Sequence, residues 1–416
     1  MPAAPVSSAP SASASAIASA SPSPVRVSPT PATSPSAAAS PSPAASPAPA
    51  ASPSAVPPPV GGTSNASIYL GDLFAGAVFI YSSNATGAVS PSAAIAGGMT
   101  GITDSNGASP IFGIAVDPSG TTYVLTQTFD STNTVVAETI GVFPAGTYGN
   151  VAPARTIGLP VTIDGESLAY NGGNLYVADD AGAGSIDVVS ASASGASTPT
   201  RTFTASGGFA NPPNKISFDT SGNVYVATVD PTATAATEAT QAVYRFPAGA
   251  GGAVAATQLT GAATGFANGV LEAAVVDGAN RTDAVVQDAA NDLYADIDEF
   301  AANATGNVAP VTSFQDTSSQ GPVDAAVDAA NAFYVSEIGA TTQYAQVNVF
   351  ANGAKTPTRT IQAYRSALAL IAIGPYVAAN ASGTMATVRR GDARPAALRA
   401  IVARRNAHRA SRGTAR

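Results

Sequence analysis

The sequence predicts an all-β protein built as a six-bladed β-propeller of four-stranded antiparallel blades. Three observations lead to this fold class. A short strand pattern recurs about every 54 residues, a second hairpin pattern precedes most copies of it, and both patterns are confined to one central region of the 416-residue chain. The two flanks differ from this region in composition, and we expect them to be disordered.

The recurring strand first appears as VFIYSSNATGAVSP, from Val78, with large apolar side chains before a glycine-containing turn. Such a pattern is typical of a strand that enters a hairpin. Further copies read IGVFPAGTYGNVAP, IDVVSASASGASTP, VYRFPAGAGGAVAA and IDEFAANATGNVAP, and a shortened copy, VNVFANGAKTP, begins at Val347. The five full copies align without a gap and share one glycine column, which consists of Gly87, Gly149, Gly195, Gly252 and Gly306.

Each copy is followed by another short strand, such as ARTIG or TRTFT, and most copies are preceded by a hairpin, as in GIAVDPSGTTYVLT and ISFDTSGNVYVAT. Each unit therefore supplies four strands. Most of the hairpin turns begin with an aspartate and contain Gly or Asn soon after it. An aspartate at this position accepts backbone N–H groups of the turn, and Gly or Asn tolerates a positive φ angle. We interpret these aspartates as turn residues rather than catalytic residues: Asp117, Asp219, Asp277 and Asp328.

The ends of the repeat region predict how the ring closes. The first unit begins at SIYLGD (Ser67–Asp72) and lacks an innermost strand, whereas an extra strand, ALALIAI (Ala367–Ile373), follows the last unit. We expect these strands to share one blade, because this arrangement removes both exposed edges. A surplus segment, PYVAAN (Pro375–Asn380), leaves a partial seventh blade open, but six blades are our prediction.

Both flanks are compositionally biased. Residues 1–60 hold 16 of the 32 prolines and no acidic residue, which predicts a disordered, semi-rigid tether or a low-complexity extension without function. Nine of the 18 Lys and Arg residues fall in the C-terminal segment, for which we favour a disordered tail over a basic interaction segment. The predicted organisation is a linker over 1–64, a propeller over 65–380 and a tail over 381–416.

The central region is strongly acidic. It holds 25 of the 26 carboxylates against eight basic residues, which leaves a net charge of about −17 and argues against nucleic acid as a partner. The chain has no Cys, and its one histidine, His408, lies in the tail, so thiol chemistry is excluded and a His-based triad within the fold is not expected. No apolar run reaches transmembrane length, and no signal-peptide pattern is visible.

On these repeats the region resembles NHL-type propellers, whose units follow the pattern P-x-G-[IV]-A-[IV]-D-x-x-G-N-[IL]-Y-V-A-D and then I-x-V-F. IFGIAVDPSGTTYVLT, FDTSGNVYVAT and NLYVADDAGAGSIDVV carry this pattern, the later units follow it more loosely, and the resemblance covers residues 67–379. It places the chain in the same broad class as SMP-30/gluconolactonase-like propellers. It implies the fold but leaves the activity open, because such propellers include binding modules, lactonases, lyases and scaffolds.

A carboxylate closes the second strand in four of the six units: Asp72, Asp179, Asp288 and Glu337. Equivalent strand ends form a ring in a propeller, so these residues are candidate ligands for Ca²⁺, which takes oxygen ligands only. The resemblance to lactonase-type propellers likewise implies a metal ion at the channel mouth. The alternative is that a strand-end aspartate accepts turn N–H bonds on a solvated acidic face.

Three arginines, Arg155, Arg201 and Arg359, share one position of the outermost strand. They could form a recognition stripe, but we interpret them as charges that protect an exposed edge strand from pairing with other chains.

We expect a non-catalytic, monomeric propeller that binds a protein, small molecule or glycan at its face. The Pro/Ala/Ser stalk favours display at the cell envelope or outside the cell. The alternative is a metal-dependent, lactonase-like hydrolase that uses the carboxylate ring. A lyase similar to the streptogramin-inactivating propellers would need a histidine within the fold, and His408 does not supply one.

Overall fold

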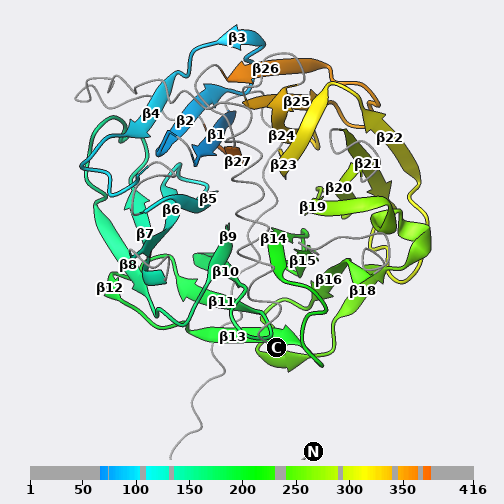
Figure 1. The fold of residues 1–416 in the computed structure, drawn as a ribbon, viewed down its shortest axis with the longest axis horizontal. Helices are drawn as coiled ribbons and strands as arrows, with labels where there is room; N and C mark the ends of the chain where they lie inside the picture. Colours follow the sequence, from blue (N-terminus) through cyan, green and yellow to red (C-terminus); the bar gives the residue numbers. More distant parts are fainter. Residues whose placement is uncertain are drawn as a thin grey trace, which may run out of the picture. The chain divides into compact units, whose positions relative to one another are not determined.

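The computed structural model describes residues 66–375, apart from residue 74 and the segments 104–108, 131–134, 230–239, 289–293, 340–344 and 364–368. These residues form six β-sheets arranged as blades around one axis (Figure 1). The predicted linker, the predicted tail and residues 376–380 lie outside the described residues. No helix in the described part of the chain is long and apolar enough to cross a membrane.

In each of blades 1 to 3, four strands follow one another from the innermost outwards. Blade 1 consists of β27 (Ala369–Pro375), β1 (Ala66–Asp72), β2 (Ala77–Ser82) and β4 (Ala93–Ala96). Blade 2 consists of β5 (Ile111–Val116), β6 (Thr122–Phe129), β7 (Val135–Phe143) and β8 (Arg155–Leu159). Blade 3 consists of β9 (Gly165–Asn171), β10 (Asn174–Asp179), β11 (Ser185–Ser190) and β13 (Arg201–Ala205).

Blades 4 to 6 repeat this order. Blade 4 consists of β14 (Pro213–Phe218), β15 (Val224–Thr228), β16 (Ala242–Phe246) and β18 (Thr257–Thr260), followed by two 3₁₀ turns, η2 (Ala262–Thr264) and η3 (Phe266–Asn268). Blade 5 consists of β19 (Gly269–Val276), β20 (Thr282–Asp288), β21 (Ala295–Phe300) and β22 (Thr312–Asp316). Blade 6 consists of β23 (Ser319–Val327), β24 (Phe333–Gly339), β25 (Ala345–Phe350) and β26 (Arg359–Ala363).

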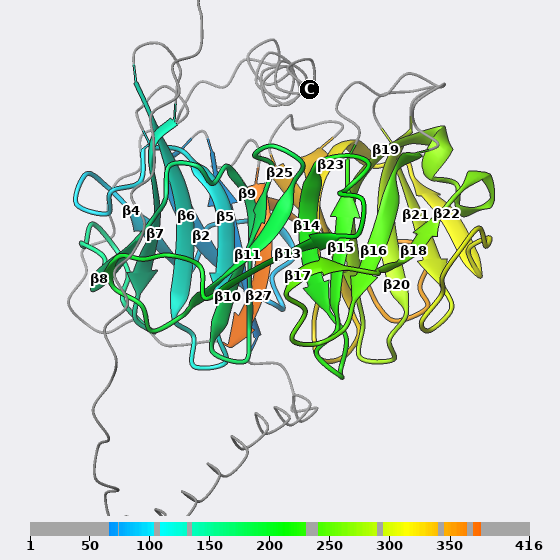
Figure 2. The ribbon, with the colours of Figure 1, turned by 90° about the horizontal axis from the view of Figure 1, so that it is seen from below.

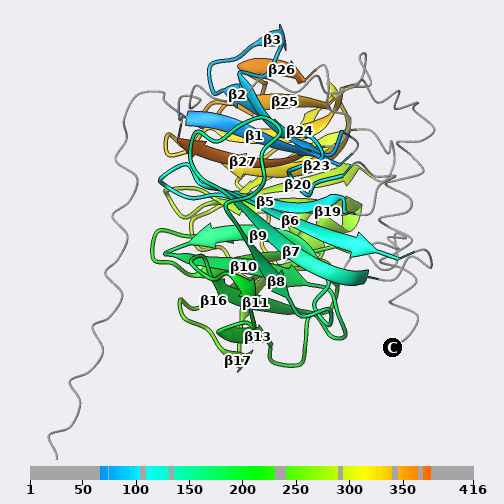
Figure 3. The same ribbon diagram turned by 90° about the vertical axis from the view of Figure 1, so that its left-hand side faces the viewer.

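The ring closes in blade 1, where the last described strand lies beside the first (Figure 3). β27 is the innermost strand of this blade and pairs antiparallel with β1, with Ile371 opposite Leu70. Each innermost strand contacts the innermost strands of both neighbouring blades, including β27 with β5 and with β23. The structure therefore confirms the predicted shared blade and the number of six blades.

The hydrophobic core lies in the seams, which are the interfaces between adjacent blades. Six clusters of buried side chains occupy the six seams. The fourth residue of the recurring strand faces the preceding blade; Phe246 of blade 4, for example, packs edge-on against Phe203 of blade 3 with ring centroids 5.0 Å apart. This column is buried in every blade, and burial of such a side chain stabilises the fold by about 1.5–3 kcal/mol. The column consists of Tyr81, Phe143, Val189, Phe246, Phe300 and Phe350.

A further pairing joins neighbouring blades. In five blades the turn after the third strand runs parallel to the outermost strand of the preceding blade, and we call this segment a strap. The straps are β3 (Gly87–Val89) on β26, β12 (Gly195–Ala196) on β8, β17 (Gly252–Val254) on β13, and single bridges from Gly149 to Ile95 and from Gly306 to Leu259. All five glycines of the predicted column have positive φ angles, between 68° and 97°, which explains why glycine occupies this position.

The straps overturn our interpretation of the arginine column. β8, β13 and β26 are not exposed edges, because a strap covers each of them. Arg201 donates a hydrogen bond to the hydroxyl of Tyr176 at 2.8 Å and lies over the ring of that tyrosine. Arg359 makes the same two contacts with Tyr334, with a hydrogen bond of 3.2 Å. Arg155 donates to the carbonyl oxygens at positions 191 and 193. These arginines pack within or between blades.

The turn aspartates have the predicted role. Asp117 Oδ1 accepts the backbone N–H groups of Ser119 and Thr121, each at 2.9 Å, and Asp328 Oδ1 accepts those of Ala330 and Ala332. Asp219 and Asp277 accept the N–H groups two and four residues ahead in the same way. Their capping of the turn backbone is confirmed.

Candidate functional site

The four predicted ion ligands lie on one face of the propeller, at which the second strands end; the blades are seen from the side in Figure 2. Three of them end β1, β10 and β20, and the fourth lies two residues before the end of β24; they are Asp72, Asp179, Asp288 and Glu337. These residues belong to four different blades. No three of them form a group whose oxygens lie within 4.8 Å of one another. Their role as ion ligands stays a prediction.

Two of the four accept turn N–H groups, as the alternative interpretation expects. Asp179 Oδ1 accepts the N–H groups of Asp164 at 2.7 Å and Ala181 at 2.8 Å, and Asp72 Oδ1 accepts that of Ala75 at 3.1 Å. Burial raises the pKa of Asp179, the Ala181 N–H opposes the rise, and the nearby carboxylate of Asp187 adds to it.

Glu337 and Asp288 have side-chain partners instead. Glu337 Oε1 accepts hydrogen bonds from the side-chain amides of Gln346, at 2.6 Å, and Asn348. Burial raises the pKa of Glu337 to about 8, and the charge of Asp316 adds to the rise. Asp288 Oδ2 accepts a hydrogen bond from Gln315 Nε2 at 3.3 Å.

A different group of carboxylates does converge. Asp164, Glu166 and Asp180 each place an oxygen within 4.8 Å of the others, and all three are buried. The antiparallel pairing of β9 with β10 brings them together, because Asp164 and Glu166 stand at the start of one strand and Asp180 follows the end of the other. Asp164 and Glu166 are not among the ligands predicted from the sequence, because that prediction rests on second-strand ends alone. The available signal was an acid-Gly-acid run, DGE, ahead of the Asp179–Asp180 pair.

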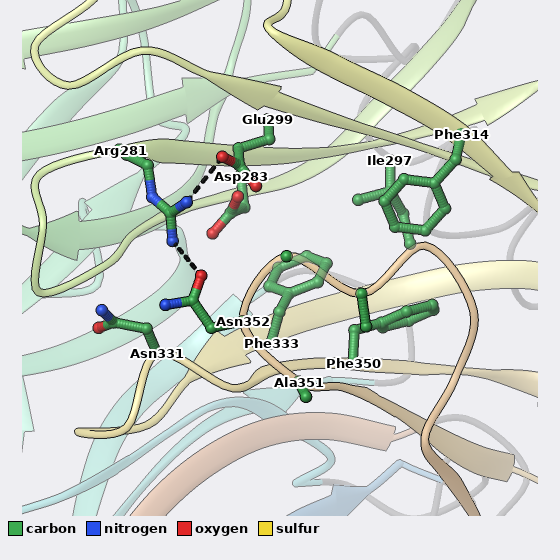
Figure 4. Close-up of a pocket in the computed structure, with 12 residues that line it drawn as sticks. Arg281, Asp283, Ile297, Glu299, Phe314, Asn331, Phe333, Phe350, Ala351 and Asn352 are labelled. Atoms are coloured by element: carbon green, nitrogen blue, oxygen red, sulfur yellow. Dashed lines mark hydrogen bonds and ion pairs between the residues drawn. The ribbon is translucent and has the colours of Figure 1, made fainter.

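A pocket opens in the seam between blades 5 and 6 (Figure 4). On one side lie the rings of Phe314, Phe333 and Phe350, with Phe350 centred 5.4 Å from Phe314 and 6.2 Å from Phe333. On the other side lie polar groups: Arg281, Asp283, Glu299, Asn331 and Asn352. We call this hollow the seam pocket.

The seam pocket lies where a strap is missing. Counted from the residue after the buried column to the start of the outermost strand, the connection has eleven residues in blades 1, 2, 3 and 5, ten in blade 4, and eight in blade 6, where it spans 351–358. Within the described residues, which include all of 351–358, β22 is the one outermost strand that no strap covers. The central residue of the outermost strand is at most 2% exposed in the other five blades, as for Ile157, whereas Phe314 of β22 is partly exposed. Val308 and Val311, just before it, are 39% and 62% exposed.

The polar side of the seam pocket is acidic but contains one cation. Arg281 donates to Asp277 Oδ2 at 2.8 Å, to Glu299 Oε1 at 2.8 Å and to Asn352 Oδ1 at 2.7 Å. Burial raises the pKa of Asp283 to about 7, Asp277 and Glu299 add to the rise, and Arg281 opposes it. The polar side therefore favours a ligand that brings hydrogen-bond donors.

No model of a known protein family matches the chain, and no curated protein matches it. Among solved structures, it is similar to a protein of unknown function from Bacteroides caccae, at 8% identity and a TM-score of 0.50, over 75% of this chain and 99% of that one. The propeller of Dos1 matches over 61% of this chain and 62% of that one, at 11% identity and a TM-score of 0.39. The WD40 propeller domain of Doa1 matches over 71% and 79%, at 10% identity and a TM-score of 0.39. The chain has the fold of a six-bladed β-propeller.

Proposed function

We propose that this protein is a non-catalytic binding propeller and that it takes an extended peptide segment of a partner at the seam pocket. The observation that carries this proposal is the outer edge of β22, which no strap covers within the described residues and which lies beside three phenylalanine rings. A strand edge next to an apolar pocket is suited to strand addition, in which backbone hydrogen bonds give affinity and a pocket for a side chain gives specificity.

The straps of the other blades indicate what such a peptide looks like. β3 and β17 both read Gly-Ala-Val and run parallel to the outermost strand that they cover. A partner segment with a small residue followed by an apolar one could pair with β22 in the same direction. Its apolar side chain would contact Phe314, and donor groups next to it would face Asp283.

Rebuilding the missing strap tests this proposal. The eight-residue connection 351–358 is replaced by the eleven-residue connection of blade 5, residues 301–311, which contains the strap glycine Gly306. Random peptides displayed on phage are selected on the full-length protein, and their affinities are measured by calorimetry. We expect enriched peptides that bind in the micromolar range and lose at least tenfold in affinity on the variant, because the new strap occupies the edge of β22.

The matched control replaces the connection of blade 5, residues 301–311, by that of blade 3, residues 190–200, which has the same length and keeps a strap. It should retain peptide binding. Failure to enrich any peptide, or equal affinity for the rebuilt-strap variant, would contradict the proposal. A glycan array probed with the same proteins tests a sugar ligand instead.

The second candidate is the metal-dependent hydrolase. It is favoured by Glu337, which is buried and whose Oε2 has no hydrogen-bond partner within the described residues. It requires an ion on Asp72, Asp179, Asp288 and Glu337. Lactone hydrolysis that depends on an added divalent ion and is lost in Glu337→Gln would support it.

We also propose that the Pro/Ala/Ser linker holds the propeller at the cell envelope or outside the cell. The composition of residues 1–64 supports this location. Protease digestion of intact cells should remove the propeller if it is displayed, and protection of the propeller until lysis would reject the proposal.

A further inference from the structure

Two buried oxygens beside Asp164, Glu166 and Asp180 have no hydrogen-bond partner within the described residues. Gln127 on β6 and Glu138 on β7 are cross-strand partners in blade 2, so their side chains share one face of the sheet. Both are almost fully buried, at 0% and 1% exposure. Gln127 Oε1 and Glu138 Oε2 accept no hydrogen bond within the described residues, although buried acceptors are nearly always paired.

Both side chains reach across the seam to blade 3. Gln127 Nε2 donates to Asp164 Oδ1 at 2.9 Å and to the Gly165 carbonyl at 3.0 Å. Glu138 Oε1 accepts the Gly165 N–H at 2.9 Å. The tips of both side chains therefore lie at the segment that carries Asp164 and Glu166, and so do their unpartnered oxygens.

Glycine at position 165 makes this close approach possible. A Cβ atom there would collide with Glu138 Oε1 and lie 2.9 Å from side-chain carbons of both Leu125 and Val177. Any larger residue would push the blade 3 strand away from blade 2. The chain thus brings oxygens from β6, β7, β9 and the end of β10 to one place in the seam.

The surroundings of this place are negative. The carboxylates of Asp179, Glu166 and Asp187 lie close enough to act on Glu138 as negative charges. None of the ion pairs within the described residues involves Glu138, Asp179 or Asp187. A water molecule could donate to the two unpartnered oxygens, but it would bring no positive charge. A divalent cation would meet both needs.

We propose that Asp164, Glu166 and Asp180, together with Gln127 Oε1 and Glu138 Oε2, form a Ca²⁺ site that fastens blade 2 to blade 3. The donor set consists of carboxylate oxygens and one amide carbonyl oxygen, which are ligands that Ca²⁺ prefers. The site differs from the ring predicted from the sequence, and its function is structural. It is also separate from the seam pocket, so either can fail without the other.

Thermal unfolding of the full-length protein tests this site. The protein is treated with EDTA, dialysed, and melted with CaCl₂ or with NaCl at equal ionic strength, because salt alone screens an acidic surface. At 1 mM Ca²⁺ we expect the Tm to rise by about 5 °C above the NaCl sample, since the ion binds the folded state alone. No rise above the NaCl control would overturn the proposal and leave a proton or a water molecule at the site.

Two variants locate the ion. In Glu138→Gln the new amide can donate to the neighbouring carboxylates, so we expect a higher Tm without Ca²⁺ and no further rise with it. Asp180→Asn should also lose the Ca²⁺ response. The matched control is Glu337→Gln, which changes an equally buried glutamate with an unpartnered Oε2 in blade 6 and should keep the full response. If Glu337→Gln loses the Ca²⁺ response and Glu138→Gln and Asp180→Asn keep it, the ion lies in the predicted ring and the site between blades 2 and 3 is overturned.

Hydrogen exchange of the unmutated protein provides a readout that does not depend on variants. Ca²⁺ should slow amide exchange in peptides that cover residues 160–190 relative to those that cover 316–348. Slowing confined to the second segment, or no slowing at all, would reject the site.

Discussion

The seam between blades 2 and 3 and the seam between blades 5 and 6 are built from the same strand pattern but differ in cover and in charge. In the first, strap β12 covers β8 and Ile157 is fully buried. In the second, no strap covers β22 within the described residues, and Phe314 remains partly exposed. A connection three residues shorter than that of most blades therefore converts a closed seam into a pocket.

The two seams also differ in the charges that surround their buried acids. Between blades 5 and 6, Arg281 neutralises Asp277 and Glu299 directly. Between blades 2 and 3, the charges that act most strongly on Glu138 are those of other carboxylates. Where the chain supplies an arginine, the acids that pair with it need no added ion. Where the strongest neighbouring charges are those of other carboxylates, an ion or a bound proton stabilises the buried acid.

The largest expected effect comes from removing the same side chain at a covered and an uncovered position. Phe203 and Phe314 occupy one column of the outermost strand, and Phe203 is 1% exposed beneath strap β17. We expect Phe203→Ala to lower the free energy of unfolding by about 3–5 kcal/mol, because it leaves a closed cavity. Phe314→Ala should cost about 1 kcal/mol, since the site is already open to water. Urea unfolding of both variants measures the difference, and equal losses would show that the strap does not determine burial.

A smaller effect should follow from removing the cation of the blade 5–6 seam. Arg281→Gln leaves the buried Asp277 and the neighbouring Glu299 without their ion pair, and we expect a loss of about 2 kcal/mol at pH 7. Arg281→Lys keeps the charge but not the forked geometry and should recover part of the loss. If Arg281→Gln unfolds at the same urea concentration as the unchanged protein, the contrast between the two seams has no energetic basis.

Local patterns in the sequence predicted the blades but not the seams. The period of the strand, the turn aspartates and the spare strand from Ala367 each depend on neighbouring residues or on simple counting, and the structure confirms them. The straps depend on parallel pairing between different blades, which leaves no local pattern except the glycine column. For this reason Arg201 was assigned to an exposed edge that the structure covers.

The two candidate sites were hidden for related reasons. The shortened copy from Val347 is visible in the sequence, but its effect falls on β22 of the preceding blade. Asp164 and Glu166 come together with Asp180 only through the register of β9 and β10, and Gln127 and Glu138 reach them from another blade. Contacts across a seam are set by the packing of whole blades, so a single repeat does not reveal them.

The smallest expected effect, when it is counted per pH unit, is a dependence of stability on pH that arises from Asp283 in the seam pocket. Its pKa is raised from 3.8 to about 7 in the folded protein, where Asp277, Glu299 and Arg281 surround it. Below about pH 4 the carboxyl group is protonated in both states. Between about pH 4 and pH 7 the folded state keeps a proton on Asp283 that the unfolded state releases. The contribution of Asp283 to the free energy of unfolding therefore falls as the pH rises, by at most about 1.4 kcal/mol per pH unit.

Asp283→Asn removes this proton, and the variant should therefore gain stability relative to the unchanged protein as the pH rises from 4 to 7. Urea unfolding at several pH values in EDTA measures this difference. Asp288→Asn, at the other end of β20, controls for the loss of one negative charge and should not show the same slope. The test also bears on the comparison of the two seams, because it asks whether Arg281 compensates all the acids around it. A flat difference between Asp283→Asn and the unchanged protein would mean that Arg281 keeps Asp283 ionised in spite of its burial, and that the blade 5–6 seam is fully neutralised.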